Sequence, residues 1–357
     1  MRVSERGWLG RRGGVDLMVA MNPQTWDADL VEIEAGGYLF YDNSKPLPKS
    51  KFRDDVNIIG VPRGGPSTGM PTRTQQSDIL ACAHASHGDT KHVLLFPEDP
   101  HECFEFAAQA LDLADRLQTQ VFLMTDLDIG MNQRLCAPFV WDDARGYDRG
   151  KVMTAAELEA GKQFARYKDV DGDGIPYRTL PGTHPDKGAY FTRGTSRNPQ
   201  AQYSERGSDY VYNMQRLLQK FDTAKSLVPQ PVISQSDVSS RHGGAVNGVI
   251  YFGSTSPAMT EAIEQLLGEG IALDTLRIRA FPFPDSVRTF IDAHDSVFVV
   301  EQNRDAQLRS LLVNEFGIAP AQLIAVLHYD GTPITARFIA DAIANRLLPA
   351  AQHEKVA

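Results

Sequence analysis

One short run of the sequence combines the residue types that bind anions. It extends from Arg63 to Asp78 and contains three glycines, two prolines, five serine or threonine hydroxyls and two arginines. Glycine and proline at this density exclude a regular helix or strand in its first half, which leaves backbone N–H groups and hydroxyls free to face an anion. Arginine forms paired hydrogen bonds to carboxylates and phosphates. The run therefore predicts an anion-binding loop that leads into the start of a helix.

Two other interpretations of this run are considered. Gly64 and Gly69 have the glycine spacing of a nucleotide-binding P-loop, but Met70 and Pro71 stand where that motif requires lysine followed by serine or threonine. The P-loop is therefore excluded. The second interpretation is a tight surface connection, and the residue pattern leaves the choice between this and an anion-binding loop open.

Alternating strand and helix patterns must position the run. Residues 1–62 hold three short strand candidates, too few for a complete α/β domain, and residues 63–230 continue the alternation up to the proline-rich boundary at Val228–Pro231. The elements expected in these two regions are strands over Val15–Met21, Tyr38–Tyr41, Val56–Val61, His92–Phe96 and Val121–Thr125, and helices over Thr72–His87, from Pro100 onward and over Asp209–Val228.

Residues 241–357 show the clearest pattern, a regular repeat of strand and helix. The expected strands are Val249–Phe252, Ala272–Ile278, Ser296–Val300 and Leu323–Leu327, each followed by a helix. Such a repeat predicts a doubly wound α/β fold with a parallel sheet and helices on both faces. Because ligands and partners meet the carboxyl ends of the strands in such folds, the loops Gly253–Ser256 and Glu301–Asn303 are the places to examine.

The stretch from residue 129 to residue 202 has weak apolar periodicity, and its length predicts an ordered excursion with a function. At its centre, Asp169, Asp171 and Asp173 have the spacing of the first ligands of a calcium loop. Leu180 stands where such a loop requires glutamate. A hard cation on the three aspartates and a solvated acidic turn both remain open.

A second motif overlaps these aspartates. Gly172-Asp173-Gly174 precedes Asn198 at nearly the spacing of the diphosphate motif of thiamine enzymes. An apolar strand leads into the glycine in those enzymes, whereas Arg166–Asp169 precedes it here, so this interpretation is rejected.

Length and composition limit the number of domains and the classes of protein that the chain could belong to. The chain has 357 residues, enough for two or three domains, and its net charge of −9 argues against a general nucleic-acid binder. No apolar run approaches the roughly 20 residues of a membrane span, and the start of the sequence lacks the pattern of a signal peptide. The three cysteines are widely separated in the sequence, so we expect no zinc site or iron–sulfur cluster held by this chain alone, and a cytoplasmic location.

The run at Arg63–Asp78 closely resembles a loop in the alpha subunits of 2-oxoacid:ferredoxin oxidoreductases, especially those of the 2-oxoglutarate synthase type. The resemblance extends over nearly the whole chain. The other segments that carry it are Met21–Thr25, Tyr177–Pro185, Tyr190–Thr195, Val299–Asn303 and His328–Gly331.

The resemblance also implies a domain organisation. Residues 1–62 would be part of the family's gamma domain, residues 63–230 part of its pyrimidine-binding domain with the excursion 129–202, and residues 241–357 its transketolase-C-terminal-like domain. The family has a longer segment between the equivalents of Val61 and Arg63, so the resemblance implies an internally and N-terminally truncated chain. A glutamate that activates the cofactor's pyrimidine ring lies in that missing segment, and we assign no catalytic residue.

For function, the resemblance implies the oxidative decarboxylation of a 2-oxoacid with coenzyme A, which forms an acyl-CoA and reduces ferredoxin. Thiamine diphosphate with Mg²⁺ and a [4Fe–4S] cluster would lie mainly on a partner beta subunit. Carried over residue by residue, Arg63 would bind the substrate carboxylate with Ser67 and Thr68 in the same pocket, and Gly64, Gly65 and Gly69 would lie beside the cofactor. The alternative is a non-catalytic assembly fragment that docks a beta subunit.

Overall fold

The structure is a computed structural model of the chain. It describes residues 15–20, 24, 26, 30–31, 33–42, 57–61, 73–132, 135–192, 195–236 and 247–348. The chain divides into two compact units, Met1–Thr72 and Arg73–Ala357. The boundary expected near Val228–Pro231 falls inside the second of these units.

The first unit contains a three-stranded parallel sheet. Its strands are β1 (Val15–Ala20), β2 (Ile33–Asp42) and β3 (Asn57–Val61), in the order β1-β2-β3. Trp26 and Tyr41 pack edge to face in its small core, with ring centroids 5.8 Å apart. The three strands predicted in this region are confirmed.

The second unit contains a five-stranded sheet in the order β11-β10-β7-β8-β6. Four of its strands are parallel, and β6 (Val232–Ser234) adds to the edge in the antiparallel direction. The parallel strands are β7 (Asn247–Phe252), β8 (Asp274–Ile278), β10 (Ser296–Glu301) and β11 (Leu323–Leu327). β10 and β11 are nearly continuous apolar runs because both faces of the sheet are covered, whereas β8 also contains Asp274, Thr275 and Arg277.

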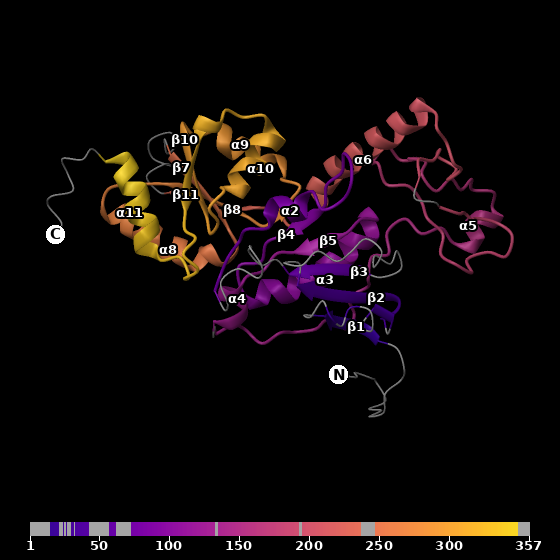
Figure 1. Cartoon of the computed structure of the whole chain (residues 1–357), viewed down its shortest axis with the longest axis horizontal. Helices are drawn as coiled ribbons and strands as arrows, with labels where there is room; N and C mark the ends of the chain where they lie inside the picture. Colours follow the sequence, from indigo (N-terminus) through magenta and orange to yellow (C-terminus); the bar gives the residue numbers. More distant parts are fainter. Residues whose placement is uncertain are drawn as a thin grey trace, which may run out of the picture. The chain divides into compact units, whose positions relative to one another are not determined.

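Helices cover both faces of this sheet, as the doubly wound pattern predicted (Figure 1). Side chains of α9 and α10 pack in one apolar core with residues such as Ile250 and Val299, and side chains of α8 and α11 pack in a second core with Val249 and Phe298. The connecting elements are η2 (Gly253–Thr255), α8 (Ser256–Gly268), α9 (Asp285–Asp292), α10 (Gln307–Phe316), η3 (Pro320–Gln322) and α11 (Ala336–Leu347).

A smaller sheet in the same unit has the order β5-β4-β9. β4 (Val93–Leu95) and β5 (Val121–Leu123) are parallel, while β9 (Ala280–Phe281) pairs antiparallel to β4. The helices α3 (Pro100–Leu117) and α6 (Gly207–Leu227) share an apolar core with these strands.

Local sequence accounts for both ends of α3. Asp99 accepts a hydrogen bond from the backbone N–H of Glu102 at 2.7 Å, and Pro100 occupies the first helical turn, where its missing N–H costs nothing. The helix ends at Gln118, which adopts the left-handed conformation with φ of 50°.

One expectation about local structure was wrong, and two short strands were not expected. The helix expected over Thr72–His87 is only α2 (Ile79–Ala83), because the backbone N–H groups of Thr74 and Gln76 donate to the carbonyls of Gly331 and Gln302 instead of to a helical turn. The antiparallel strands β6 and β9 were not expected, since each has no more than three residues and pairs with a distant strand.

The excursion after β5 is largely irregular but ordered by ion pairs to α3. It includes α4 (Leu127–Met131) and α5 (Ala155–Glu159). Arg145 pairs with Asp112 at 2.9 Å, and Arg178 pairs with Asp115 at 2.7 Å. Among the residues that the structure describes, no helix is both long and apolar enough to cross a lipid bilayer.

Candidate functional site

The order of the large sheet reverses direction between β7 and β10. The chain passes from β7 to β8 on one side and then to β10 on the other side of β7. In open α/β sheets, ligands bind in the crevice at the carboxyl ends of two such strands. Here β7 ends at Phe252 and β10 ends at Glu301, so the two loops that the sequence indicated, Gly253–Ser256 and Glu301–Asn303, lie at these strand ends.

Gln76, in the second half of the glycine-rich run, bonds to the loops at both strand ends. Gln76 is 8% exposed, and its Nε2 donates to Asp126 Oδ2 at 3.0 Å and to Ser254 Oγ at 3.3 Å. Its Oε1 accepts from the backbone N–H of Gln302 at 3.3 Å. Its backbone carbonyl accepts from Asn303 Nδ2 at 3.2 Å. Both ends of the Gln76 amide are therefore used.

The partners of Gln76 also bind one another. Ser254 Oγ donates to Asp126 Oδ2 at 2.6 Å, and Gln302 Nε2 donates to Ser254 Oγ at 2.9 Å. Asp126 Oδ1 caps α4 by accepting from two of its backbone N–H groups. We call Gln76, Asp126, Ser254 and Gln302 the Gln76 cluster. It joins the residues that follow β5, β7 and β10.

Gly253 makes room for this arrangement. Its φ is +58°, in the left-handed region that favours glycine, and a Cβ placed there would lie 3.1 Å from Gln76 Nε2. A larger residue would combine backbone strain with a close contact to the amide. The glycine at the end of β7 therefore permits the approach of Gln76.

Buried polar atoms near the cluster lack partners among the described residues. They are Gln302 Oε1, Thr74 Oγ1 and Ser77 Oγ. An unsatisfied buried polar atom costs about 1 to 3 kcal/mol, so several at one place indicate a region built for more than packing.

Glu301 supports the loop after β10 from inside the protein. It is fully buried, and its carboxylate accepts from the backbone N–H groups of Leu308 and Arg309 at 2.7 and 3.0 Å and from Asn303 Nδ2 at 2.8 Å. Burial raises the pKa of Glu301 and outweighs these hydrogen bonds, which act in the opposite direction. The contacts tie the start of α10 to the end of β10.

The residues predicted to bind substrate and cofactor lie outside the described part of the chain. These are Arg63, Gly64, Gly65, Ser67, Thr68 and Gly69. Arg73, the second arginine of the run, is described and has an exposed side chain. Gln76 and Asp126 were not singled out from the sequence as site residues. The position of Asp126 directly after a predicted strand was the signal that could have indicated it.

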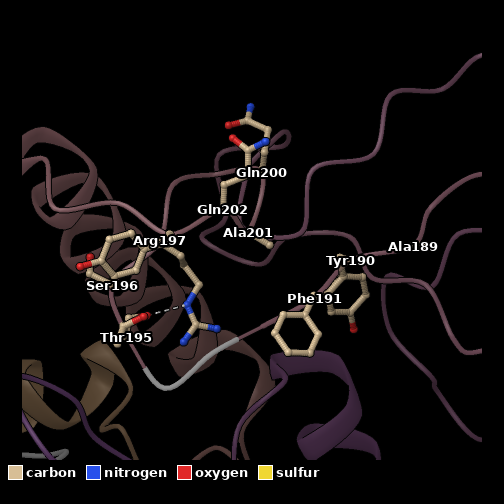
Figure 2. A pocket seen from close by; sticks show the side chains of 10 residues that line it. Ala189, Tyr190, Phe191, Thr195, Ser196, Arg197, Gln200, Ala201 and Gln202 are labelled. Atoms are coloured by element: carbon tan, nitrogen blue, oxygen red, sulfur yellow. Dashed lines mark hydrogen bonds between the residues drawn. The ribbon is translucent and has the colours of Figure 1, made fainter.

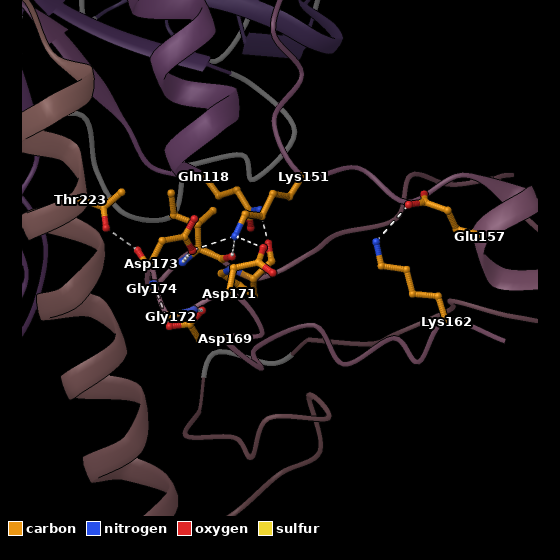
Figure 3. A network of polar contacts seen from close by, with 12 residues as sticks. Gln118, Lys151, Glu157, Lys162, Asp169, Asp171, Gly172, Asp173, Gly174 and Thr223 are labelled. Carbon is orange, nitrogen blue, oxygen red and sulfur yellow. Dashed lines mark hydrogen bonds and ion pairs between the residues drawn. The ribbon is translucent and has the colours of Figure 1, made fainter. Parts of the chain in front are cut away.

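The acidic loop predicted to hold a cation is bound by a lysine instead (Figure 3). Lys151 Nζ lies 2.6 Å from Asp171 Oδ2, 2.7 Å from Asp173 Oδ1 and 3.0 Å from the carbonyl oxygen of Ile175. Asp169 accepts from the backbone N–H groups of Gly172 and Gly174. Among the described residues, no group of three His, Cys, Asp or Glu side chains is arranged to hold a metal ion, and Lys151 lies between two of the three aspartates predicted to bind one.

The pKa values of this ion pair follow from the same contacts. Burial alone would lower the pKa of Lys151, but hydrogen bonds to Asp171 and Asp173 raise it. The hydrogen bond from Lys151 lowers the pKa of Asp171. The pair is therefore charged at neutral pH.

The excursion also holds a pocket of about 460 Å³ (Figure 2). Tyr190 and Phe191 lie at one side of it and are 40% and 74% exposed. Arg197 also lines the pocket. Its side chain donates to the Thr195 carbonyl at 3.2 Å and to the Tyr167 hydroxyl at 2.6 Å. Its guanidinium thus already has partners within the chain.

One part of the chain matches a known protein family. Residues 55–147 match the family "Pyruvate flavodoxin/ferredoxin oxidoreductase, thiamine diP-bdg". The matched residues include the glycine-rich run, Gln76 and Asp126.

Sequence similarity to curated proteins extends over most of the chain. The chain is 28% identical over 287 residues to the alpha subunit of 2-oxoacid:ferredoxin oxidoreductase 1 from Sulfurisphaera tokodaii. The aligned region covers 79% of this chain and 43% of the relative. It is 26% identical over 281 residues to the 2-oxoglutarate synthase subunit KorA from Methanothermobacter thermautotrophicus, covering 75% of this chain and 67% of that subunit. The chain is thus a relative of the 2-oxoacid:ferredoxin oxidoreductase alpha subunits, which confirms the resemblance noted in its sequence. It spans less than half the length of the Sulfurisphaera relative.

A solved structure shares the fold. It is the 2-oxoglutarate:ferredoxin oxidoreductase from Magnetococcus marinus with 2-oxoglutarate, coenzyme A and succinyl-CoA bound. The TM-score is 0.70 at 20% sequence identity, and the match covers 94% of this chain and 63% of that chain. The α/β class predicted from the sequence is confirmed.

Proposed function

We propose that this chain is the alpha subunit of a 2-oxoacid:ferredoxin oxidoreductase of the 2-oxoglutarate type. The enzyme would decarboxylate the 2-oxoacid, transfer the acyl group to coenzyme A and pass two electrons to ferredoxin. The observation that carries the proposal is the family match over residues 55–147. The matched segment contains the whole Arg63 run, which includes Gln76, and also Asp126, which bonds to Gln76.

Within this enzyme, the Arg63 run would hold the substrate. The Arg63 guanidinium would bind a carboxylate of the 2-oxoacid, and the hydroxyls of Ser67 and Thr68 would line the same pocket. Gly64, Gly65 and Gly69 would allow the backbone to approach the cofactor closely, since they carry no side chain.

The residues of this chain do not form the set that an iron–sulfur cluster requires. A [4Fe–4S] cluster takes four thiolates, and the chain has three cysteines, of which Cys82 is buried and Cys136 exposed. A cluster would therefore be held mainly outside this chain, on a beta subunit. The family resemblance implies that thiamine diphosphate with its Mg²⁺ also lies mainly on that subunit, while this chain would contribute the segment that matches a family described as thiamine diphosphate-binding. Thiamine diphosphate supplies the carbanion chemistry that decarboxylation of a 2-oxoacid needs.

The test is an assay of the assembled enzyme. The chain is co-expressed with a beta subunit encoded beside it, purified under anaerobic conditions and mixed with 2-oxoglutarate, coenzyme A and an oxidised viologen dye. Dye reduction that requires both 2-oxoglutarate and coenzyme A would support the proposal. A purified complex that reduces no dye with 2-oxoglutarate, pyruvate or other 2-oxoacids would overturn it.

A second candidate is a non-catalytic fragment that docks the same beta subunit. The exposed aromatic side chains of Tyr190, Phe191 and Tyr203 favour it, because such residues are enriched at protein interfaces. A complex that forms in a pull-down but is inactive in the dye assay would support this function. Turnover by the complex would exclude it.

A further inference from the structure

Three arginines lie close to one tyrosine ring of the excursion. The guanidinium carbons of Arg166, Arg197 and Arg216 are 5.1, 5.0 and 5.8 Å from the centre of the Tyr167 ring. Arg216 belongs to α6, and Lys220 follows four residues later on the same face of that helix. We call Arg166, Arg216 and Lys220 the basic cluster. It brings together positive charges from the excursion and from α6.

Two cations of the basic cluster are buried. Arg216 and Lys220 are 9% and 6% exposed. Arg216 donates to the carbonyl of Gly174 at 2.9 Å, but its Nε has no hydrogen-bond partner among the described residues. Burial, with the charges of Arg216 and Arg166, lowers the pKa of Lys220 to about 7. Because buried charges in proteins are normally paired, the basic cluster has the character of a site that lacks its anion.

The nearby carboxylate of Asp169 is committed to another contact. Its two oxygens accept from the backbone N–H groups of Gly172 at 2.9 Å and Gly174 at 2.8 Å. Burial lowers the pKa of Arg216, and the charge of Asp169 offsets this effect only in part. One carboxylate therefore stands beside three cations, and the excess of positive charge remains.

Open space borders this side of the protein. The pocket of about 460 Å³ is lined by Tyr190 and Arg197 (Figure 2). The guanidinium carbon of Arg166 lies 5.6 Å from the centre of the Tyr190 ring, and Arg197 donates to the hydroxyl of Tyr167. The pocket and the basic cluster thus share these aromatic contacts, so a ligand beside the cluster has room for more than a small ion.

We propose that the basic cluster binds a phosphate group, carried either by inorganic phosphate or by a phosphate ester. At neutral pH such a group has about two negative charges and three strong acceptor oxygens, which suit three neighbouring cations. Arg166 and Arg216 would donate through their guanidinium groups, which match phosphate geometry, and Lys220 would donate through its ammonium. All three residues belong to this chain, so the proposal is independent of the proposed function.

The first experiment measures thermal unfolding of the full chain at pH 7 in sodium phosphate and in sodium chloride of equal ionic strength. At about tenfold excess of phosphate over its Kd, we expect the unfolding temperature to be roughly 2 to 5 °C higher in phosphate than in chloride. Lys220→Met and Arg166→Gln should lose most of this difference. The variants are needed because phosphate also stabilises proteins in general by exclusion from their surface.

Each variant has a matched control that removes a positive charge nearby. Lys225→Met lies on the same helix as Lys220→Met and removes a lysine that pairs with Asp222. Lys168→Gln is two residues from Arg166→Gln and removes an exposed lysine. Both controls should keep the difference between phosphate and chloride. Equal unfolding temperatures of wild type in the two salts would overturn the proposal, as would equal losses in Lys220→Met and Lys225→Met.

The second experiment measures binding directly and distinguishes the two sources of the phosphate group. The full chain is titrated calorimetrically with inorganic phosphate and with glycerol 3-phosphate. We expect Arg166→Gln and Lys220→Met to weaken binding by roughly tenfold or more, since each removes a charge-assisted hydrogen bond. Tighter binding of glycerol 3-phosphate would assign the site to an ester, and tighter binding of inorganic phosphate would assign it to the free anion. Affinities unchanged in both variants would place the anion elsewhere and overturn the proposal.

Discussion

Lys151 Nζ lies 2.7 Å from Asp173 Oδ1, at the place where the sequence predicted a metal ion. Asp171, Asp173 and the carbonyl of Ile175, all of which contact this ammonium, stand at the third, fifth and seventh positions of a calcium-loop pattern that begins at Asp169. A cation from the chain thus satisfies oxygen atoms that a calcium ion would bind in a loop of that type.

Replacement of this lysine should destabilise the protein. Lys151→Met leaves the carboxylates of Asp171 and Asp173 close together without their cation, so we expect the free energy of unfolding in urea to fall by about 1 to 2 kcal/mol. Lys162→Met is the control. It removes a lysine from an exposed pair with Glu157, whose loss should lower the free energy of unfolding less than the loss of Lys151 does. Equal effects of the two substitutions would contradict the structural role of Lys151.

A buried lysine on α6 should destabilise the protein below pH 10. Burial, with the nearby charges of Arg216 and Arg166, lowers the pKa of Lys220 from 10.5 to about 7. As pH falls from 10.5 to 7, the unfolded chain gains a proton that the folded chain does not, so stability decreases. We expect Lys220→Met to raise the free energy of unfolding, most strongly at pH 7 and below and progressively less toward pH 10.

Lys225 on the same helix provides a control, because its replacement should change the stability in the opposite direction. A hydrogen bond to Asp222 raises the pKa of Lys225, and the stability that this contact adds is present below pH 10.5 and lost above it. Lys225→Met should therefore destabilise the protein slightly at pH 7. Urea unfolding curves of both variants at pH 7 and pH 10 test the pair, and a destabilising effect of Lys220→Met at pH 7 would refute the first prediction.

His92 should make the protein sensitive to mild acid. Burial lowers its pKa from 6.5 to about 4, and the charge of Lys220 adds to the effect. The stability that depends on neutral His92 is present above pH 6.5 and is lost as pH falls through 4. Between pH 7 and pH 5 we expect wild type to lose about 2 kcal/mol that His92→Gln does not lose. Parallel pH dependence of the two proteins in urea unfolding would disprove this assignment.

The two arginines of the glycine-rich run should differ in their effect on substrate binding. If Arg63 binds a carboxylate of the 2-oxoacid, Arg63→Ala removes a charge-assisted hydrogen bond and raises KM roughly 10- to 100-fold. Arg73 has an exposed side chain, and Arg73→Ala is expected to change KM less than about threefold. Steady-state assays of the assembled enzyme with varied 2-oxoglutarate measure both. The reverse order of effects would move the carboxylate site to Arg73.

Prediction from the sequence was most accurate for strands and helices whose structure follows from the pattern of their own residues. Strands β7, β8, β10 and β11 were expected within a few residues of their observed bounds, and β10 and β11 carry continuous apolar runs. The segment around Thr74 and Gln76 was mistaken for a helix because its backbone bonds to Gly331 and Gln302, more than two hundred residues away. Local periodicity carries no information on such partners.

The candidate site was predictable in part for the same reason. The rule on carboxyl ends of parallel strands indicated the loops that contain Ser254 and Gln302, and in the structure both loops hydrogen-bond to Gln76. It could not show that Gln76 enters the crevice, since a glutamine in a polar segment has no distinctive pattern. The acidic loop shows the converse: spacing suggested a metal, whereas Lys151, eighteen residues before Asp169, provides the charge.

The pairing of β9 with β4 has a consequence for biosynthesis. Leu95 pairs with Ala280, so the small sheet acquires its third strand only when about 185 more residues have left the ribosome. At roughly 5 to 20 residues per second, the nascent chain waits for roughly 10 to 40 seconds with one edge of β4 open. An open strand edge invites pairing with other chains. Chaperone binding during this interval would protect the protein from aggregation while its second unit is still being translated.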